Sequence, residues 1–433
     1  MKIIQNLLSG FLPFTLLLIG GLYLTFKLKF VQITKFPKSL KLFKSALKSK
    51  NDNPDGITSA QSACTALSAT VGTGNIAGVA GAISLGGAGA VFWMWVSAVL
   101  GMAVKYAEIT LAVKYRNQKE NSFLGGPMFY IKNGLQPIFK PLAFLYALSA
   151  IPATLCTGNL TQTNAAVSSL NIGLGGKMWV GLLFALLTFI IIRGGGRLIG
   201  KATEKIVPLM SVVYTLLTLG VIIYNIEYLP KAFKMIFIGA FTPKAVTAGA
   251  VCSVINVIIT GASRGVFSNE AGLGTSAMAH SLAIDADADT QGLYGIFEVF
   301  IDTIAICTLT ALTILCSRVN IDYGSVASSE LVAKALHINY GDFAPLLLGV
   351  MMSVFAFSSI IGWALYGHIC TEYIFGRKAC KLFNLIYPLG CIMGAVFKAE
   401  IAWQLSSVFN GIMLCINLPA ILLLSDKLKF GRK

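Results

Sequence analysis

Glycine interrupts two long apolar runs of this chain, in residues 68–78 and 260–272. Where a helix unwinds inside an apolar medium, its N–H and C=O groups lose their i→i−4 partners and need a polar substitute. A half-helix that starts near Gly74 would direct N–H groups and a positive dipole end into the first break, which suits a carboxylate. A half-helix that ends near Val71 would present free carbonyls, which suit a hard monovalent cation. The two breaks are therefore candidate binding sites.

Two interpretations of these glycines compete. Small residues also allow membrane helices to pack closely, and a single G-x-G run would favour that packing role. Two glycine breaks, one in each half of a chain and at corresponding positions, are instead typical of the binding sites of membrane transporters. We therefore favour binding sites over packing positions.

The composition sets the environment of the chain. Of its 433 residues, 56% are hydrophobic and 12% are charged, whereas soluble proteins carry about 25% charged residues. A globular core of this length could not bury so much apolar surface, which excludes a soluble enzyme. Lipid requires each segment to satisfy its own backbone, so we expect an all-α polytopic membrane protein.

Eleven runs are close to the length of about 20 apolar residues that a transmembrane helix needs. They are residues 7–26, 57–84, 88–113, 142–170, 178–192, 206–225, 245–282, 291–317, 344–375, 382–397 and 402–425. A lysine-rich segment follows the first run and no A-x-A cleavage site does, so we interpret this run as a retained helix rather than a signal peptide.

Without the first run, ten spans remain, which divide into five plus five. Because five is odd, the second five must enter the membrane with the opposite topology. The predicted organisation is an extra N-terminal helix with a basic cytoplasmic loop (1–56), a first five-helix repeat (57–226) and an inverted second repeat with a basic tail (227–433).

Basic residues give the orientation. The net charge is +16, and most Lys and Arg residues fall in every second loop, beginning with the loop after the first span. Cytoplasmic loops of membrane proteins hold such an excess, so no nucleic-acid partner is needed to explain the charge. We expect a cell-membrane protein with its N-terminus outside and its C-terminus in the cytoplasm. Asp285, Asp287 and Asp289 in one cytoplasmic loop favour a solvated tip over a metal site.

The sequence lacks the motifs that would indicate other functions. The nine cysteines form no C-x-x-C pair, so we expect small buried hydrophobes and neither a disulfide framework nor a zinc site. No H-E-x-x-H, nucleophile elbow or P-loop is present, which disfavours an enzyme or an ATP-driven pump. A channel is weaker than a transporter, because no repeated carbonyl filter or ring of like charges appears.

Several short motifs recur from the second predicted span to the ninth. They lie at residues 71–80, 86–87, 92–95, 125–128, 264–272, 291–293, 300–303 and 360–363. Together they resemble the alanine/glycine:cation symporter family. The resemblance implies a leucine-transporter-type 5+5 inverted repeat, and import of a small neutral amino acid, usually alanine or glycine, with sodium. Proton coupling, or a larger neutral amino acid such as glutamine or serine, is the alternative.

The resemblance also implies a substrate site. It places the substrate carboxylate near Thr73 and Gly74 and matches Gln162 to a glutamine that contacts the substrate. No carboxylate flanks the first break, so the Gln162 oxygen and backbone carbonyls would receive the substrate ammonium. The same comparison puts Gly265 at the second break. Two further positions, one helical turn apart, are Ser359 and Trp363.

For the coupling ion, the fold implies carbonyls and hydroxyls only. We expect sodium near Ser68 and Val71, with a hydroxyl from Ser358 or Ser359, and no other metal or cofactor. Beyond the second break, three polar residues are either a gate that closes by ion pairing or caps for the free backbone. They are Arg264, Asn269 and Glu270. No obligate protein partner is evident.

Further polar residues lie in the spans, where they are costly and often functional. Lys105 and Glu108 are three residues apart, and we expect them to pair. Glu298 and Asp302 are either a proton or second-cation site or hydrogen-bonded acids between helices. His368 departs from the family pattern, where we expect an acid.

Overall fold

The computed structural model describes residues 12–48, 56–119, 122–170, 172–242, 253–324, 329–397 and 399–428. Residues 7–11 of the first predicted span, residues 245–252 of the seventh, Cys252 and tail residues 429–433 lie outside this part. The described cysteines are free thiols, of which Cys415 alone is half-buried and the others are buried.

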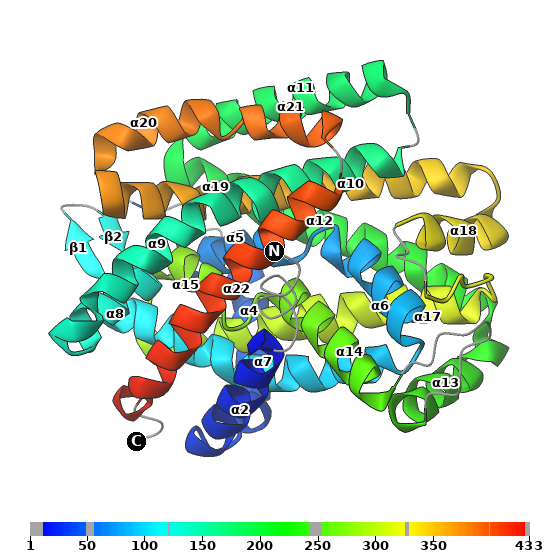
Figure 1. Ribbon diagram of the computed structural model, residues 1–433, viewed down its shortest axis with the longest axis horizontal. Helices are drawn as coiled ribbons and strands as arrows, with labels where there is room; N and C mark the ends of the chain where they lie inside the picture. The colour runs from blue at the N-terminus through cyan, green and yellow to red at the C-terminus, as the bar shows by residue number, and fades with distance from the viewer. Residues whose placement is uncertain are drawn as a thin grey trace.

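The first half of the chain is helical apart from one small hairpin (Figure 1). Its elements are α2 (Leu12–Lys27), α3 (Val31–Thr34), α4 (Phe36–Lys48), α5 (Ser59–Thr70), a π-helix (Gly74–Gly78), α6 (Val79–Gly86), α7 (Ala90–Lys114), β1 (Asn117–Lys119), β2 (Ser122–Leu124), α8 (Pro127–Gly134), a 3₁₀ turn (Pro137–Phe139), α9 (Lys140–Leu155), a π-helix (Cys156–Leu160), α10 (Thr161–Ser169), α11 (Leu174–Arg193) and α12 (Gly195–Tyr224). The antiparallel β1–β2 hairpin was missed by the all-α prediction, because three-residue strands carry too little alternation to detect.

The second half continues the helical pattern. Its elements are a 3₁₀ turn (Ile226–Tyr228), α13 (Leu229–Phe241), α14 (Val254–Asn269), α15 (Thr275–Ser281), α16 (Ala288–Val299), a π-helix (Phe300–Cys307), α17 (Thr308–Cys316), α18 (Ser329–Tyr340), α19 (Phe343–Phe375), α20 (Arg377–Ile386), α21 (Leu389–Val396), α22 (Ala399–Leu423) and a 3₁₀ turn (Ser425–Lys427).

Within the described residues, eight helices are long and apolar enough to cross a membrane, or nine if the bent pair α5 and α6 is one span. They correspond to nine of the eleven predicted spans. The first prediction coincides with α2, which has 16 described residues, and the seventh coincides with the shorter pair α14 and α15. The multi-pass helical class is thus confirmed, while the count of eleven and the 5+5 repeat stay predictions.

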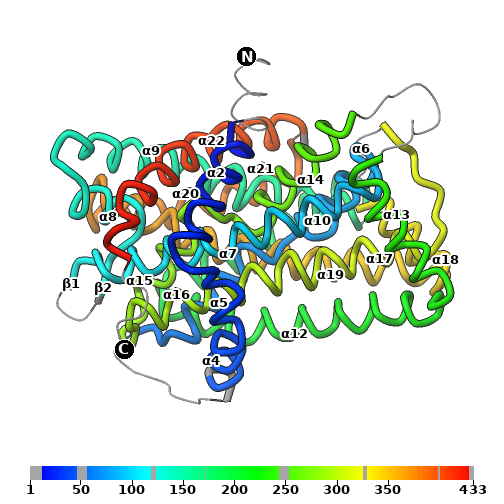
Figure 2. Tube along the Cα trace, turned by 90° about the horizontal axis from the view of Figure 1, so that it is seen from below, coloured from blue at the N-terminus to red at the C-terminus, as the bar shows by residue number. Residues whose placement is uncertain are grey.

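Helix α7 is the central element of the molecule. It packs against α14, α15 and α16 on one side and against α2 on another, and Figure 2 shows α2 crossing it beside α22. All of its residues from Leu100 to Val113 are buried. Such all-round burial explains why its sequence is mostly apolar and has small residues where neighbours approach, with Lys105 and Glu108 as the charged exceptions.

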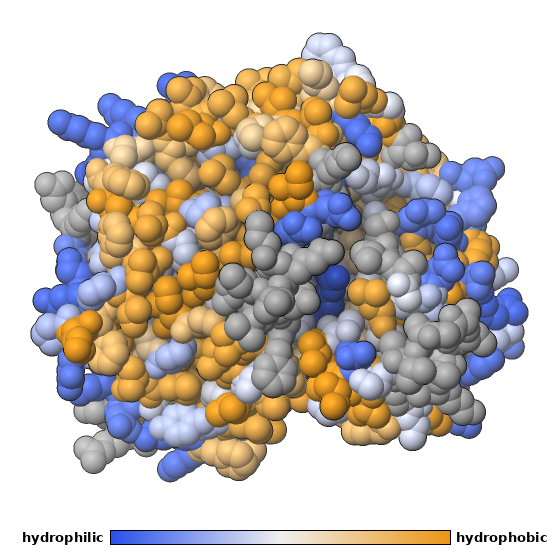
Figure 3. All heavy atoms as spheres, in the orientation of Figure 1, coloured by the Kyte–Doolittle hydropathy of each residue, from blue (hydrophilic) through white to orange (hydrophobic). Residues whose placement is uncertain are grey.

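Peripheral helices show the opposite pattern, because their apolar side chains point outward. Trp179 and Leu186 on α11 are 74% and 57% exposed, and Leu216 on α12 is 65% exposed. Figure 3 shows apolar residues over much of one face, with hydrophilic residues towards the two ends of the long axis. A continuous apolar surface of this kind suits contact with lipid rather than with water.

Helix α19 approaches the middle of the fourth predicted span very closely. A Cβ atom on Gly158, in the Cys156–Leu160 π-helix, would collide with Cβ and Cγ of Trp363. Gly158 therefore permits a contact that no larger residue allows.

We predict that Gly158→Ala destabilises the protein by about 1–3 kcal/mol, because the extra methyl overpacks this contact. A lower apparent Tm of the purified protein in detergent would show it. Gly175→Ala, at a position with open space around it, is the matched control and should unfold like the wild type. An unchanged Tm for Gly158→Ala would contradict the close approach.

Candidate functional site

The first predicted break is present. Helix α5 begins at the Thr58–Gln61 capping box and ends at Thr70, and the chain resumes at Gly74 in a π-helix that leads into α6. The two segments meet at an angle of 48°. Residues 71–73 between them are buried and non-helical, so unwound backbone lies in the interior of the protein as the sequence predicted.

Backbone carbonyls are released at this break. The N–H of Gly72 donates to the side-chain oxygen of Asn75 at 2.9 Å, and the N–H of Asn75 donates to the Gly72 carbonyl at 3.2 Å. In a continuous α-helix these two N–H groups would bind the carbonyls of Ser68 and Val71. Both residues are predicted sodium ligands, and their carbonyls are free of those helical bonds.

Gln162 contacts the break, although not as predicted. Its side-chain oxygen accepts hydrogen bonds from the Thr73 N–H at 3.3 Å and the Thr73 hydroxyl at 2.8 Å, and its amide nitrogen donates to the Thr157 carbonyl at 3.3 Å. A carbonyl oxygen has two lone pairs, and Thr73 uses both. In this arrangement Gln162 holds the break in place, and its oxygen is not available to an ammonium group.

Helix α19 covers the break from the other side. A Cβ atom on Gly72 would collide with the Ser359 hydroxyl, and one on Gly362 would collide with the Ser68 hydroxyl. Because α19 also meets Gly158 through Trp363, one helix joins the break to the fourth span. The structure thus brings together most of the predicted site residues.

Five buried polar atoms on α19 lack partners among the described residues, and three of them belong to predicted site residues. The hydroxyls of Ser358 and Ser359 and the indole N–H of Trp363 are buried without a hydrogen bond among the described residues. Buried polar groups in proteins are nearly always satisfied, so the serine hydroxyls beside the released carbonyls call for a polar ligand. Hydroxyl and carbonyl oxygens together suit a hard cation.

The second break does not lie at Gly265, and that prediction was wrong. Helix α14 runs through Gly265 without interruption and ends at Asn269. The chain is non-helical at residues 270–274 before α15 starts, with positive φ at Glu270, Gly272 and Gly274.

Gly265 has the packing role that was the alternative interpretation. A Cβ atom there would collide with the Ser97 hydroxyl and would lie 3.2 Å from the Met94 carbonyl, both on α7. Its use as a substrate contact stays a prediction.

Two ionisable side chains of α7 form hydrogen bonds with the backbone of the second break, at residues 269–274. Lys105 donates to the Asn269 carbonyl at 2.7 Å, and Glu108 accepts from the Gly274 N–H at 3.1 Å. Glu108 also accepts from Asn417 on α22 at 2.7 Å. Each of the two α7 residues therefore binds free backbone of the break, where the sequence led us to expect a direct pair between them.

Asn269 and Glu270, at the end of α14, also accept hydrogen bonds from residues close to them in the chain. The Asn269 side chain accepts from the Ala271 N–H at 3.0 Å, and Glu270 accepts from the Thr275 hydroxyl at 2.5 Å. These bonds support the capping interpretation of Asn269 and Glu270. In the part of the chain described here, Arg264 forms no ion pair with Glu270, and a gating role for these residues stays a prediction.

A buried acid connects the two broken helices. Asp302, in the Phe300–Cys307 π-helix, accepts from Asn75 at 2.7 Å, from Ser268 at 2.8 Å and from Thr303 at 2.7 Å. Asn75 belongs to the first break and Ser268 to the last turn of α14. In this structure Asp302 is a hydrogen-bonded acid between helices, which was one of its two interpretations; the other was a proton or second-cation site.

Asn75 and Ser268 were missed as site residues. An asparagine directly after the first G-x-G run was the available signal, because a polar amide in an apolar span needs partners. π-Helical segments, which are frequent at functional sites, carry Asn75, Gly158 and Asp302.

The ends of α5 and α15 that face the predicted cytoplasmic side are joined. Ile57 and Ala283 form a parallel bridge, and the Ile284 N–H donates to the Ile57 carbonyl at 3.0 Å. The exposed Asp285 accepts from the Ser59 N–H at 2.7 Å. These contacts join the two broken helices at this end.

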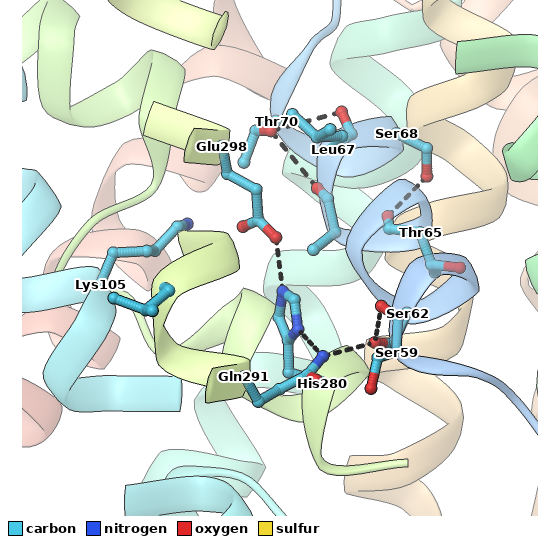
Figure 4. Close-up of polar contacts among 12 residues, drawn as sticks. Ser59, Ser62, Thr65, Leu67, Ser68, Thr70, Lys105, His280, Gln291 and Glu298 are labelled. Carbon is cyan, nitrogen blue, oxygen red and sulfur yellow. Dashed lines mark hydrogen bonds and ion pairs between the residues drawn. The ribbon is translucent and has the colours of Figure 1, made fainter. Parts of the chain in front are cut away.

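A second layer of contacts lies deeper, between α5, α15 and α16 (Figure 4). Buried His280 pairs with buried Glu298 through one ring nitrogen. Its other ring nitrogen lies 2.6 Å from the amide nitrogen of Gln291, which donates to Ser62 at 2.9 Å. Glu298 therefore has a basic partner, which sequence reasoning missed because the two residues are 18 positions apart.

The fold is also found in solved structures of membrane transporters. The fold is similar to that of MhsT in complex with L-phenylalanine, with a TM-score of 0.55 and 13% identity over 84% of this chain and 88% of that one. It is also similar to a manganese transporter of Eremococcus coleocola, with a TM-score of 0.54 and 16% identity over 87% and 81% of the two chains. The chain thus has the fold of these two transporters.

The chain belongs to the sodium:alanine symporter family, which it matches over residues 1–430. It is 38% identical to the sodium/alanine symporter AgcS of Methanococcus maripaludis, over 95% of this chain and 91% of the relative. It is 35% identical to a probable sodium/glutamine symporter, GlnT, of Bacillus subtilis, over 98% and 87% of the two chains. An uncharacterized transporter of Haemophilus influenzae is 39% identical over 95% and 90%. The resemblance noted in the sequence is confirmed.

Proposed function

We propose that this protein imports a small neutral amino acid, with alanine or glycine favoured, together with sodium across the cell membrane by alternating access. The first break carries the proposal. It combines the released carbonyls of Ser68 and Val71 with the unpartnered hydroxyls of Ser358 and Ser359. The N-terminus lies outside and the C-terminus lies in the cytoplasm in this proposal.

The two helix ends that border the first break bind different ligands. Carbonyls of the α5 end and a serine hydroxyl of α19 receive sodium, which needs oxygen ligands and no counter-charge from the protein. The Gly74 N–H next to Thr73, with the positive end of the next helix, receives the substrate carboxylate. Because both ligands use one interruption, binding of either orders the backbone that the other needs, which couples them.

Substrate size follows from what borders the break. Trp363 is 1% exposed and packs against Gly158, so little room remains for a long side chain. A larger substrate such as serine or glutamine is the runner-up, since GlnT is a relative. Proton coupling is the alternative for the ion.

Uptake by the purified protein in liposomes tests this function. We expect labelled alanine to accumulate when a sodium gradient is imposed and not when choline replaces sodium, because sodium binding orders the break. Unlabelled glycine should compete better than glutamine. Accumulation that follows a proton gradient and ignores sodium would refute the sodium coupling.

Variants at the break test the site. We predict that Gln162→Ala and Trp363→Ala each lower alanine uptake at least about tenfold, which corresponds to about 1.4 kcal/mol. The first change removes the acceptor that holds Thr73, and the second removes the cover of the pocket. Trp179→Ala, at a 74% exposed tryptophan of α11, is the control. Normal uptake by both site variants, with normal insertion, would mean that the pocket lies elsewhere.

A cross-link tests alternating access. We predict that the double variant Ile57→Cys/Ala283→Cys loses uptake when oxidised and regains it on reduction, because a disulfide across the bridge stops the two broken helices from separating at the cytoplasmic end. The two single variants under the same oxidant are controls. Full uptake by the cross-linked protein would show that these ends do not separate during transport.

A further inference from the structure

Three ligand-type side chains converge at the end of α19 that follows the substrate residues. They are His368, Glu372 and Cys380, and their ligating atoms all lie within 4.8 Å of one another. His368 and Glu372 share one face of α19 because they are four residues apart. Cys380 comes from α20, which turns back at Gly376, where φ is 77°.

The surroundings prepare these groups for ligation. One ring nitrogen of His368, Nδ1, lies 3.3 Å from the side-chain oxygen of Asn384 on α20. An amide oxygen only accepts, so this contact is a hydrogen bond when Nδ1 carries the proton and the lone pair is on Nε2. Metal-bound histidines typically have such a second partner, which fixes their tautomer.

The burial and the charge of these side chains also suit the binding of a metal ion. Cys380 is 4% exposed, and the Glu372 side chain is 8% exposed, with Nε of the largely exposed Arg377 at 3.6 Å from its carboxylate. A thiolate and a carboxylate together neutralise a divalent cation. The guanidinium of Arg377, on an exposed side chain, can stay as an outer partner of the carboxylate.

The donor set selects the metal. Sulfur, imidazole nitrogen and carboxylate oxygen suit Zn²⁺ and similar transition metals, whereas Na⁺, Mg²⁺ and Ca²⁺ prefer oxygen alone. Bonds of about 2.0–2.3 Å to zinc place tetrahedral ligands roughly 3.3–3.8 Å apart. Side-chain rotations that close the present spacing by about 1 Å are therefore enough, and water completes the fourth position.

We propose that His368, Glu372 and Cys380 bind one zinc-class divalent cation, which fastens α20 to α19. On binding, the Cys380 thiol loses its proton to solvent and the sulfur forms the bond to the metal. His368 lies five residues beyond Trp363, or about 7.5 Å along the helix. The site is thus on the helix that covers the first break, but outside the break itself.

Sequence reasoning gave no sign of this site and led us to expect no metal other than sodium. The ligands follow an H-x₃-E-x₇-C spacing with a single cysteine, which matches no recognised zinc motif. Only the corner between α19 and α20 brings the cysteine back to the histidine and the glutamate.

Metal binding to the purified full-length protein tests the proposal directly. After equilibration with Zn²⁺ and removal of the excess, we expect one zinc per chain by elemental analysis. With Co²⁺, a thiolate-to-cobalt charge-transfer band should appear in the near ultraviolet. Zinc should also raise the apparent Tm, since it binds the folded state.

Variants separate this site from adventitious binding. Cys380→Ser should abolish the cobalt–thiolate band, and His368→Ala and Glu372→Gln should each weaken zinc binding at least tenfold. Cys415→Ser, which removes the half-buried thiol of α22, is the matched control and should bind like the wild type. A wild-type protein without the band, or a band that survives Cys380→Ser, would overturn the proposal. None of these measurements depends on transport, so they stand or fall separately from the proposed function.

Discussion

The structure depends on the cost of leaving backbone polar groups without partners in an apolar interior. Each interrupted helix meets this constraint differently. At the first break, Asn75 of the same segment accepts from Gly72, and Gln162 of α10 accepts from Thr73. At the second break, Lys105 and Glu108 of the neighbouring helix α7 bind the free backbone groups. The carbonyls of Ser68 and Val71 stay without their helical bonds at the first break, and the proposed function places its ligands there.

The two breaks are also mechanically connected. Asp302 accepts from Asn75 at the first break and from Ser268 at the end of α14, so the two cannot move apart without breaking bonds to a buried acid. Towards the predicted cytoplasm, the Ile57–Ala283 bridge joins the same broken helices directly, and Gln291 of α16 links Ser62 of α5 to His280 of α15. Opening at that end therefore requires loss of both layers, while the Asp302 contacts can persist as a pivot. Discrete packed arrangements of this kind carry coupling between sites.

Sequence reasoning succeeded where one residue type has one physical meaning, and failed where it has two. Apolar runs located most spans, since lipid contact and burial both require them. Glycine in a membrane helix either breaks the helix or allows close approach, and Gly265 does the second although the sequence favoured the first. Partners distant in the chain were invisible as well. Glu298 appeared to lack a basic neighbour until folding placed His280 against it, and nothing local indicated that Thr73 would occupy the Gln162 oxygen.

The location of the acids bears on how charge is handled at the first break. Glu108, Glu270 and Asp302 each accept hydrogen bonds from neighbouring groups, and none flanks Val71. A cation there would meet only neutral oxygens from the protein, which bind a lone buried charge poorly. A zwitterionic solute changes this balance, because its carboxylate is a counter-charge that the protein itself lacks. Under the proposed function, the solute and the ion are then each incomplete ligands alone, and obligatory coupling follows from electrostatics at one break rather than from a separate device.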